Sequence, residues 1–300
     1  MINKSVNISL IIPIYNENKN ISSFFNEINN LNTSIINELI FIDDGSDDGS
    51  GNKLSECIND FNSKNDQSKI SLKIYKNFKN RGYGFSLKKG IKNSQNNINA
   101  IIDLDLSYTI DDLNKLSEFM VNNHEYYDLV LGERNINKTN TTFIKRIGKS
   151  FINKITNFVF GENIIDYNSG LRIFKKELVL EYIKIYSDRF SFTTSMTIAF
   201  LSQKHDIKFI DINYEDRGGE SKLKTKDFFS FVYTVFSLLF FFKPFKVLLP
   251  LILPGYLLFI YFLIIDFQNG NLTDKTMLLF NFSFLATILI FLTDKFNKLK

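Results

Sequence analysis

The sequence predicts an α/β protein with a mostly parallel sheet, followed by an interfacial helix and two transmembrane helices. Two observations predict this fold class. Short apolar runs alternate with segments of helical spacing through most of the 300-residue chain, which is the pattern of a doubly wound sheet. Beyond Asp227, Phe, Leu and Ile take over from Asn, Lys and Asp. We therefore expect a catalytic domain over residues 1–224, an interfacial helix over 225–243 and a two-helix anchor over 244–300.

Each predicted strand is a short apolar run, and a polar cluster follows most of them. Near-continuous apolar runs indicate strands buried on both faces, and they occupy Ile8–Ile14, Leu39–Ile42, Ile70–Tyr75, Ala100–Ile102 and Leu129–Leu131. The polar clusters at the strand ends are Tyr15–Glu17, Asp43–Ser46, Asn80–Gly84 and Asp103–Asp105. Because ligands bind outside the carboxyl ends of parallel strands, we expect these clusters to form one site.

The C-terminal tail contains two segments long enough to cross a bilayer. A hydrocarbon core of about 30 Å needs roughly 20 apolar residues in a helix, and segments 247–265 and 276–293 meet this requirement. Pro250 and Pro254 would fall in the first turns of the earlier segment, where proline is tolerated.

Lysines determine the topology that we expect. They flank the apolar stretch 228–242 on both sides, so a crossing there would place one lysine group outside, against the positive-inside tendency. We interpret this stretch as an interfacial helix, with a third crossing as the alternative. The catalytic domain is then cytoplasmic, and only the loop around Asp266–Lys275 is external.

Charge and cysteine content exclude several classes of protein. The net charge of +4 is mild, and no basic stretch with interleaved aromatic residues precedes the tail, so nucleic acid is not an expected partner. Cys57 is the only cysteine, which excludes an internal disulfide and a cysteine-based zinc cluster. The apolar run at 8–12 is short and ends at Pro13, which does not fit a signal peptide.

Asp103 and Asp105 are the strongest candidates for a metal site. Alternate side chains of an extended chain share a face, so the two carboxylates point together while Leu104 turns towards the core. Adjacent carboxylates repel each other unless a cation joins them, and oxygen ligands suit Mg²⁺ or Mn²⁺. Asp-x-Asp alone is a weak signal. Its place after a buried strand, beside three other polar clusters, predicts a metal that would neutralise a leaving diphosphate.

Two glycine-containing clusters allow both a ligand-binding and a structural interpretation. The carboxylates of Asp43–Gly45 can accept hydrogen bonds from a base or ribose, and the alternative is a turn with a helix cap at Asp47 or Asp48. Residues 81–84 open a helix and would lie near a nucleotide or phosphate. A plain turn is the alternative for that segment.

Seven segments carry a resemblance to known enzymes. Residues 12–17 (IPIYNE), 42–50 (IDDGSDDGS), 80–84 and 103–105 resemble the ordered motifs of family-2 glycosyltransferases with the GT-A fold. Residues 132–134 (GER), 166–172 (DYNSGLR) and 217–223 (RGGESKL) resemble the polyprenyl-phosphate sugar transferases, the group of dolichol-phosphate mannose synthase and the bacterial undecaprenyl-phosphate glucosyltransferases. The tail resembles the bacterial type, so the resemblance covers nearly the whole chain.

The resemblance implies roles for individual residues. It places a UDP- or GDP-sugar donor at Pro13, Tyr15, Glu17, Ile42, Asp44, Asp103 and Leu104. The metal, Mg²⁺ or Mn²⁺, is assigned to Asp103 and Asp105, with Ser107 as a further contact where many relatives have Gln. The catalytic residues implied are Asp105, Arg134, Asp166 and Arg217. The acceptor phosphate is assigned to Arg134, Arg146 and Lys222.

The implied reaction is the transfer of a sugar from a nucleotide-sugar to undecaprenyl or dolichyl phosphate, with inversion of the anomeric centre. A phosphate monoester has a second pKa of about 6, so its oxygen is already anionic near neutral pH and needs no strong base. Asp166 has two candidate roles, as a residue that orients an arginine or as a base, and we favour the orienting role. The alternatives are transfer to another membrane lipid or a growing glycan, and a non-catalytic scaffold that binds nucleotide-sugars. The sequence leaves the sugar and the oligomeric state open, a homo-oligomer included.

Overall fold

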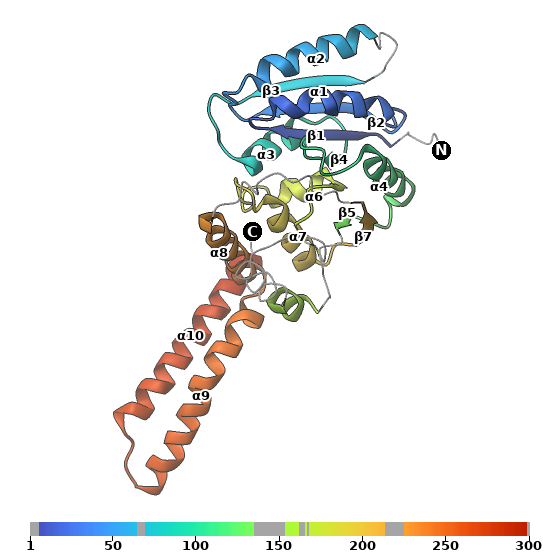
Figure 1. Ribbon diagram of the computed structural model, residues 1–300. Coiled ribbons are helices and arrows are strands. Elements are labelled where there is room, and N and C mark those ends of the chain that lie inside the picture. Colours follow the sequence, from blue (N-terminus) through green and yellow to red (C-terminus); the bar gives the residue numbers. More distant parts are fainter. Residues whose placement is uncertain are drawn as a thin grey trace. The chain divides into compact units, whose positions relative to one another are not determined.

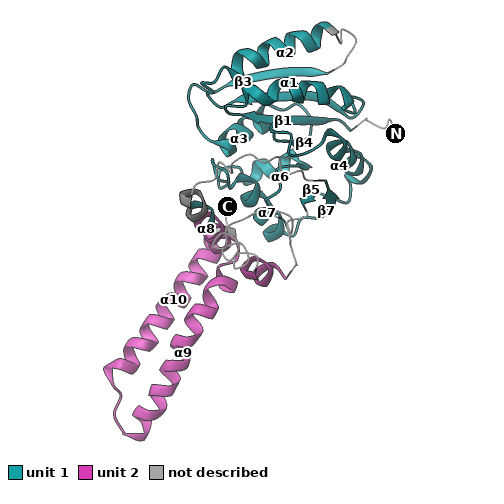
Figure 2. Cartoon of the chain, in the orientation of Figure 1, with its two compact units in different colours: residues 1–146, 164–231 teal, residues 147–163, 232–300 magenta. Residues whose placement is uncertain are grey.

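The computed structural model describes residues 6–64, 70–134, 154–161, 166, 168–213 and 225–298. The chain forms two compact units, residues 1–146 with 164–231 and residues 147–163 with 232–300 (Figure 2). The boundary between the units falls inside a helix, and the domain division expected from the sequence stays a prediction.

The first unit is built on a seven-stranded sheet with the strand order β3-β2-β1-β4-β6-β5-β7 (Figure 1). The strands are β1 (Ile8–Ile14), β2 (Ile36–Asp43), β3 (Ser71–Lys76), β4 (Ile98–Ile101), β5 (Leu129–Arg134), β6 (Arg172–Lys175) and β7 (Ile207–Ile212). Neighbouring strands are parallel except where β6 pairs with β4 and β5. The predicted mostly parallel sheet is confirmed, and the sequence reasoning missed β6 and β7.

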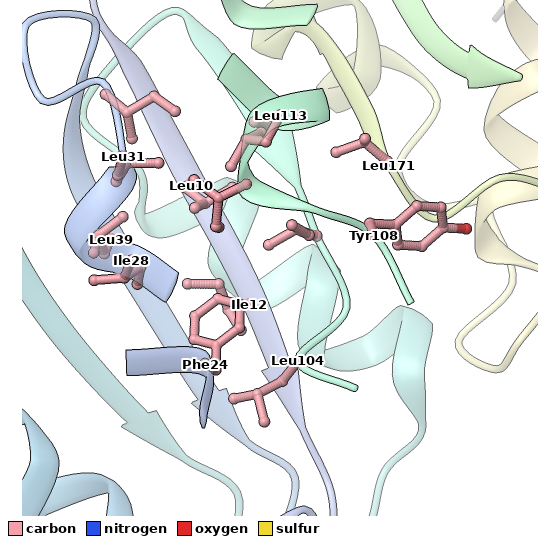
Figure 3. Packing of buried hydrophobic residues seen from close by; sticks show 14 of the residues in the cluster. Leu10, Ile12, Phe24, Ile28, Leu31, Leu39, Leu104, Tyr108, Leu113 and Leu171 are labelled. Carbon is pink, nitrogen blue, oxygen red and sulfur yellow. The ribbon is translucent and has the colours of Figure 1, made fainter. Parts of the chain in front are cut away.

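Helices cover both faces of this sheet. They are α1 (Asn18–Glu27), the 3-10 turn η1 (Ile28–Asn30), α2 (Ser50–Lys64), α3 (Tyr83–Asn93), α4 (Ile110–Asn123), α6 (Lys176–Glu181) and α7 (Phe192–Gln203). Leu10 and Ile12 of β1 belong to a core that also holds Phe24 of α1 and Leu113 of α4 (Figure 3). Ile11 points to the opposite face, towards Gly90 of α3. A strand covered on both faces accounts for the unbroken apolar run of β1.

The strand order reverses at the carboxyl end of β1. From β1 the chain winds outward through β2 to β3, and then returns to the other side of β1 as β4. Open α/β sheets bind ligands where the strand order reverses in this way. Because β6 is antiparallel, its first residue, Arg172, pairs with Ile101 of β4 and Leu131 of β5. The segment that precedes β6 therefore reaches the same rim as Asp103.

The tail consists of α8 (Thr225–Phe242), α9 (Pro244–Gln268) and α10 (Asp274–Lys298), with α9 and α10 side by side (Figure 1). Pro244–Gln268 and Asp274–Phe296 are long and apolar enough to cross a membrane, so the two predicted spans are confirmed as candidates. The apolar part of α8, Ser230–Phe242, is shorter. Its interfacial position stays a prediction.

Pro250 and Pro254 do not lie where we expected. The helix begins at Pro244, which is earlier than predicted, and both later prolines are inside it. Pro244 occupies the first turn, where its missing N–H has no partner to lose. Prolines inside transmembrane helices are tolerated because local adjustments satisfy the freed backbone groups.

Candidate active site

Asp103 and Asp105 lie just beyond β4, at the reversal of strand order. Asp103 is partly buried and Asp105 is exposed, while Leu104 between them is in the core (Figure 3). Leu104 is buried as expected, but residues 104 and 105 form a turn and not an extended chain, so the common direction of the two carboxylates stays a prediction. The hydroxyl of Tyr83 donates to Asp103 Oδ1 at 2.9 Å. Gly170 lies against the other oxygen of Asp103, and any side chain at Gly170 would collide with that oxygen.

The surroundings of Asp103 make this carboxyl group less acidic than an ordinary aspartate. Burial and then repulsion by Asp105 raise the pKa of Asp103 to about 6, although the Tyr83 bond and the charges of Arg134 and Arg172 act in the opposite direction. Burial and the nearby Asp103 also raise the pKa of Tyr83 well above its usual value. Tyr83 therefore keeps its proton and remains a donor. Adjacent carboxylates with this mutual repulsion are the arrangement that a divalent cation stabilises.

The oxygen donors fit a hard cation with few protein ligands. In the described part of the chain, no group of three or more His, Cys, Asp or Glu side chains is arranged so that it could hold a metal ion. Two carboxylates are nevertheless what Mg²⁺ commonly takes from a protein that binds it with substrate phosphates and water. Ser107 donates its N–H and hydroxyl to Asp105 Oδ1, at 3.0 and 2.6 Å. Ser107 thus fixes the direction of Asp105, and its predicted contact with the metal stays a prediction.

Arg134 and Asp166 form a two-pronged ion pair at the same rim. Arg134 Nε donates to Asp166 Oδ2 at 2.6 Å, and a terminal nitrogen of Arg134 donates to Oδ1 at 2.9 Å. Asp166 is buried and also accepts the N–H of Asn168 at 3.2 Å. Paired charges of this geometry are strong and directional. Asp166 therefore holds the Arg134 side chain in place, and its role in the reaction stays a prediction.

Arg172 is a buried arginine whose role the sequence reasoning missed. Its side chain is fully buried and donates to Ser169 O, to Thr193 O at 2.8 Å and to Thr197 Oγ1 at 3.3 Å. Burial lowers its pKa to about 10, so it stays charged near neutral pH. Among the described residues no carboxylate forms an ion pair with it. The sequence contains one signal that could have identified a buried arginine. Arg172 is a single charged residue between Leu171 and Ile173, at the start of a short apolar strand.

Arg172 and Asn168 connect the rim to α7. The hydroxyls of Thr193 and Thr194 donate to Asn168 Oδ1 at 2.6 and 2.9 Å, and Arg172 bonds to the carbonyl of Thr193. The first turn of α7 is thereby fixed to the segment beside Asp103. The polar side chains of this turn thus hold the scaffold together.

Asp44 accepts hydrogen bonds from the protein itself. It is buried and accepts from Asn77 Nδ2 at 2.7 Å and from the backbone N–H groups of Arg81 and Gly82 at 3.0 and 2.8 Å. These bonds attach the end of β2 to the loop after β3. A contact of Asp44 with the nucleotide stays a prediction.

The Gly82-x-Gly84 segment makes close contact with a distant loop. A side chain at Gly84 would collide with the carbonyl oxygens of Ser187 and Arg189, and Phe85 N–H donates to Asp188 O at 2.9 Å. The glycines therefore permit backbone packing, which supports the plain-turn interpretation of residues 81–84.

The remaining acidic loop also has a structural role. Asp48 accepts the N–H of Ser50 at 2.9 Å, at the start of α2, and the N–H of Asn18 at 3.1 Å. The helix-cap interpretation holds for Asp48. This loop and the segment after β1 are thus joined, which orients Tyr15 and Glu17 at the rim.

The other predicted nucleotide contacts divide into exposed and buried side chains. Tyr15 is exposed, and Pro13 and Glu17 are partly buried. Ile42 and Leu104 are packed in the interior, so a ligand can reach only their backbone atoms. Three of the predicted site residues, Arg146, Arg217 and Lys222, lie outside the described residues.

The sequence of this chain is similar to those of known glycosyltransferases. A family model described as Glycosyl transferase family 2 matches residues 9–183. Dolichol-phosphate mannosyltransferase from Pyrococcus furiosus is 25% identical over 244 residues, which are 77% of this chain and 63% of that protein. Undecaprenyl-phosphate 4-deoxy-4-formamido-L-arabinose transferase from Pectobacterium atrosepticum is 24% identical over 217 residues, or 72% of this chain and 62% of its own length. The chain thus spans less than two thirds of these two relatives.

Solved structures share the fold. Glucosyl-3-phosphoglycerate synthase from Mycobacterium tuberculosis, in complex with Mn²⁺, uridine diphosphate and phosphoglyceric acid, superposes with a TM-score of 0.60 at 15% identity, covering 78% of each chain. Similarity at this level of identity establishes the architecture alone, and it confirms the predicted GT-A fold.

Proposed function

The chain belongs to glycosyl transferase family 2, and on this premise we propose that it transfers a sugar from a nucleotide-sugar to polyprenyl phosphate at the cytoplasmic face of a membrane. Relatives that act on dolichol phosphate and undecaprenyl phosphate support the acceptor class. The two candidate spans support a membrane location.

The ion pair between Arg134 and Asp166 is the observation that carries this proposal. A hydroxyl acceptor needs a base to remove its proton, whereas a phosphate monoester is already an anion near neutral pH. Both oxygens of Asp166 accept hydrogen bonds from Arg134, which favours an orienting role over proton removal. An arginine held in this way presents a fixed cation, which suits an anionic acceptor.

The donor would lie along the rim between β1 and β4. Tyr15 and the neighbouring polar residues would contact the nucleotide, and Asp103 and Asp105 would hold Mg²⁺ or Mn²⁺ beside its diphosphate. The chemistry supplied by such an ion is neutralisation of charge on the departing diphosphate. The Mn²⁺ bound with uridine diphosphate in the mycobacterial structure supports this assignment. Attack by the acceptor oxygen from the face opposite the diphosphate would invert the anomeric centre.

The decisive experiment compares acceptors and donors. Purified full-length protein is incubated with Mg²⁺ or Mn²⁺, a panel of labelled UDP- and GDP-sugars, and either polyprenyl phosphate or a neutral diacylglycerol. We expect a lipid-linked sugar with the phosphate acceptor only. Glycosylation of the neutral lipid in place of the phosphate would support the alternative, transfer to another membrane lipid.

The orientation in the membrane has its own test. In a Cys57→Ser background, Asn271→Cys is placed in the loop between α9 and α10, and Ser63→Cys is placed in α2. A membrane-impermeant maleimide should label the loop position in intact cells and the α2 position only after permeabilisation. The reverse pattern would place the catalytic unit outside.

A further inference from the structure

The second unit contains a helical hairpin with one well-defined internal face. Tyr256 of α9 and Thr287 of α10 share a hydrogen bond of 2.9 Å between their hydroxyls. Ser283 of α10 lies against Gly255, and the ring of Phe280 contacts the ring of Phe259 in a tilted arrangement, with 5.2 Å between the ring centroids. One face of α10 is therefore filled by α9.

Asn281 lies on the opposite face of α10. It is two residues from Ser283, roughly 200° around a helix of 3.6 residues per turn, and it is exposed while Ser283 is buried. Exposed apolar residues surround it, namely Met277, Leu278, Phe284, Leu285, Ile288 and Leu292. The amide is thus the polar centre of an exposed apolar surface on the face of α10 opposite Ser283.

The Asn281 amide makes no hydrogen bond with the described residues. An asparagine on a helix can bond to its own helix. The side chains of Asn93 and Asn123 donate to the carbonyls of Lys89 and Phe119, four residues earlier in each case. On α10 itself, Thr293 donates to Leu289 O at 2.8 Å. Asn281 makes no such bond along its own helix.

The depth of Asn281 makes this lack of a partner costly. It follows Asp274 by seven residues, so it lies roughly 10 Å along the helix at 1.5 Å per residue. If α10 crosses the bilayer as proposed, this depth is inside a hydrocarbon core of about 30 Å. An amide in hydrocarbon without a hydrogen bond is strongly unfavourable, and its side chain is too short to reach the lipid headgroups. Polar residues at such positions usually contact another helix.

We propose that Asn281 joins two copies of this chain by a symmetric hydrogen-bonded contact between their α10 helices. A carboxamide carries both a donor and an acceptor, so two identical amides across a twofold axis satisfy each other. The isoprenoid chain of a polyprenyl lipid has no group that can do this at the same depth. The inference rests on the proposed membrane anchor, but it does not depend on the sugar or on the active-site residues.

Cross-linking of the full chain in vesicles tests the contact. In a Cys57→Ser background, Leu285→Cys is on the Asn281 face, and Phe282→Cys is about 100° around the helix from Asn281. Both positions are exposed, at 59% and 74%. Purified protein is reconstituted into vesicles at several protein-to-lipid ratios and oxidised, and the fraction of disulfide-linked dimer is measured. We expect a dimer from the first variant and little from the second.

Asn281→Leu, added to Leu285→Cys, should weaken association about tenfold, which corresponds to a hydrogen-bonded polar pair in a membrane. Thr293→Val is the matched control, because its hydroxyl is already bonded within α10, and it should leave the dimer fraction unchanged. Equal cross-linking with and without Asn281, or no dimer at any dilution, would overturn the proposal. Resistance to carbonate extraction and transferase activity are measured on the same samples. A protein that inserts and is active but does not dimerise refutes this inference alone, whereas one that fails to insert refutes the anchor.

Discussion

The two halves of the active-site rim use acidic residues differently. On the β1–β2–β3 side, Asp44 and Asp48 accept backbone N–H groups and hold loops together. On the β4–β6–β5 side, Asp103 and Asp105 repel each other, and Asp166 orients Arg134. The oxygens of Asp44 and Asp48 are satisfied by donors of the protein, whereas two neighbouring carboxylates that repel each other are stabilised by a cation. The position of an acidic residue in a motif therefore does not reveal whether the protein satisfies its carboxylate or leaves it available to a cation.

The largest expected effect comes from removing half of the carboxylate pair. Asp105→Ala should lower turnover by roughly 10³-fold or more, because a bound metal contributes several kcal/mol to charge stabilisation. The measurement is the rate of lipid-linked product formation at saturating substrates. Asp111→Ala, an exposed acid on α4, is the matched control and should retain full activity. Unchanged turnover in the Asp105 variant would remove the metal assignment.

The oriented arginine should give the next largest effect. Arg134→Lys keeps the charge but loses the bidentate geometry with Asp166, and we expect kcat/KM to fall about 10- to 100-fold. The KM for polyprenyl phosphate should rise more than the KM for the nucleotide-sugar. Arg189→Lys, at an exposed site, serves as the control. Equal changes in both KM values would argue against a role in binding the acceptor.

Measurements of stability should rank the two halves of the rim in the reverse order, with the larger loss of stability on the β1–β2–β3 side. Asp44→Asn places an amide where a buried carboxylate accepts three hydrogen bonds, and we expect a loss of about 2–3 kcal/mol in the free energy of unfolding. Asp105→Asn removes a repulsion, so without metal it should leave stability unchanged or slightly raised. Denaturant titration of the detergent-solubilised protein checks both. A larger loss in the Asp105 variant would reverse the comparison.

The smallest expected effect is the pH dependence of the α2 cap. Burial acts to raise the pKa of Asp48, but hydrogen bonds from Ser50 and Asn18 outweigh it, and the pKa is lowered from 3.8. A lowered pKa in the folded state means that the stabilisation is complete above the unfolded value and is lost as pH falls through the folded value. Asp48→Asn should therefore lower Tm slightly at pH 7, and the difference from wild type should close in strong acid. A difference that grows in acid would contradict the cap.

Local patterns in the sequence predicted much of the fold and part of the site. The apolar runs identified β1 to β5, although β5 extends to Arg134 and not only to Leu131. The antiparallel β6 was missed because four residues beginning with an arginine carry too little periodicity. The contact between Gly84 and residues 187–189 joins segments about a hundred positions apart. No local pattern contains that information.

By itself, the sequence determined the strands, the polar residues at their ends and the two apolar helices of the tail, because each of these depends on neighbouring residues and on solvent preference. Tertiary structure alone decided which acids remain available for a ligand. Asp44 is satisfied by the loop after β3, Asp166 is paired with Arg134, and Arg172 is buried behind them. These outcomes depend on which donors the fold brings within hydrogen-bonding distance, and the spacing of residues along the chain does not fix that distance.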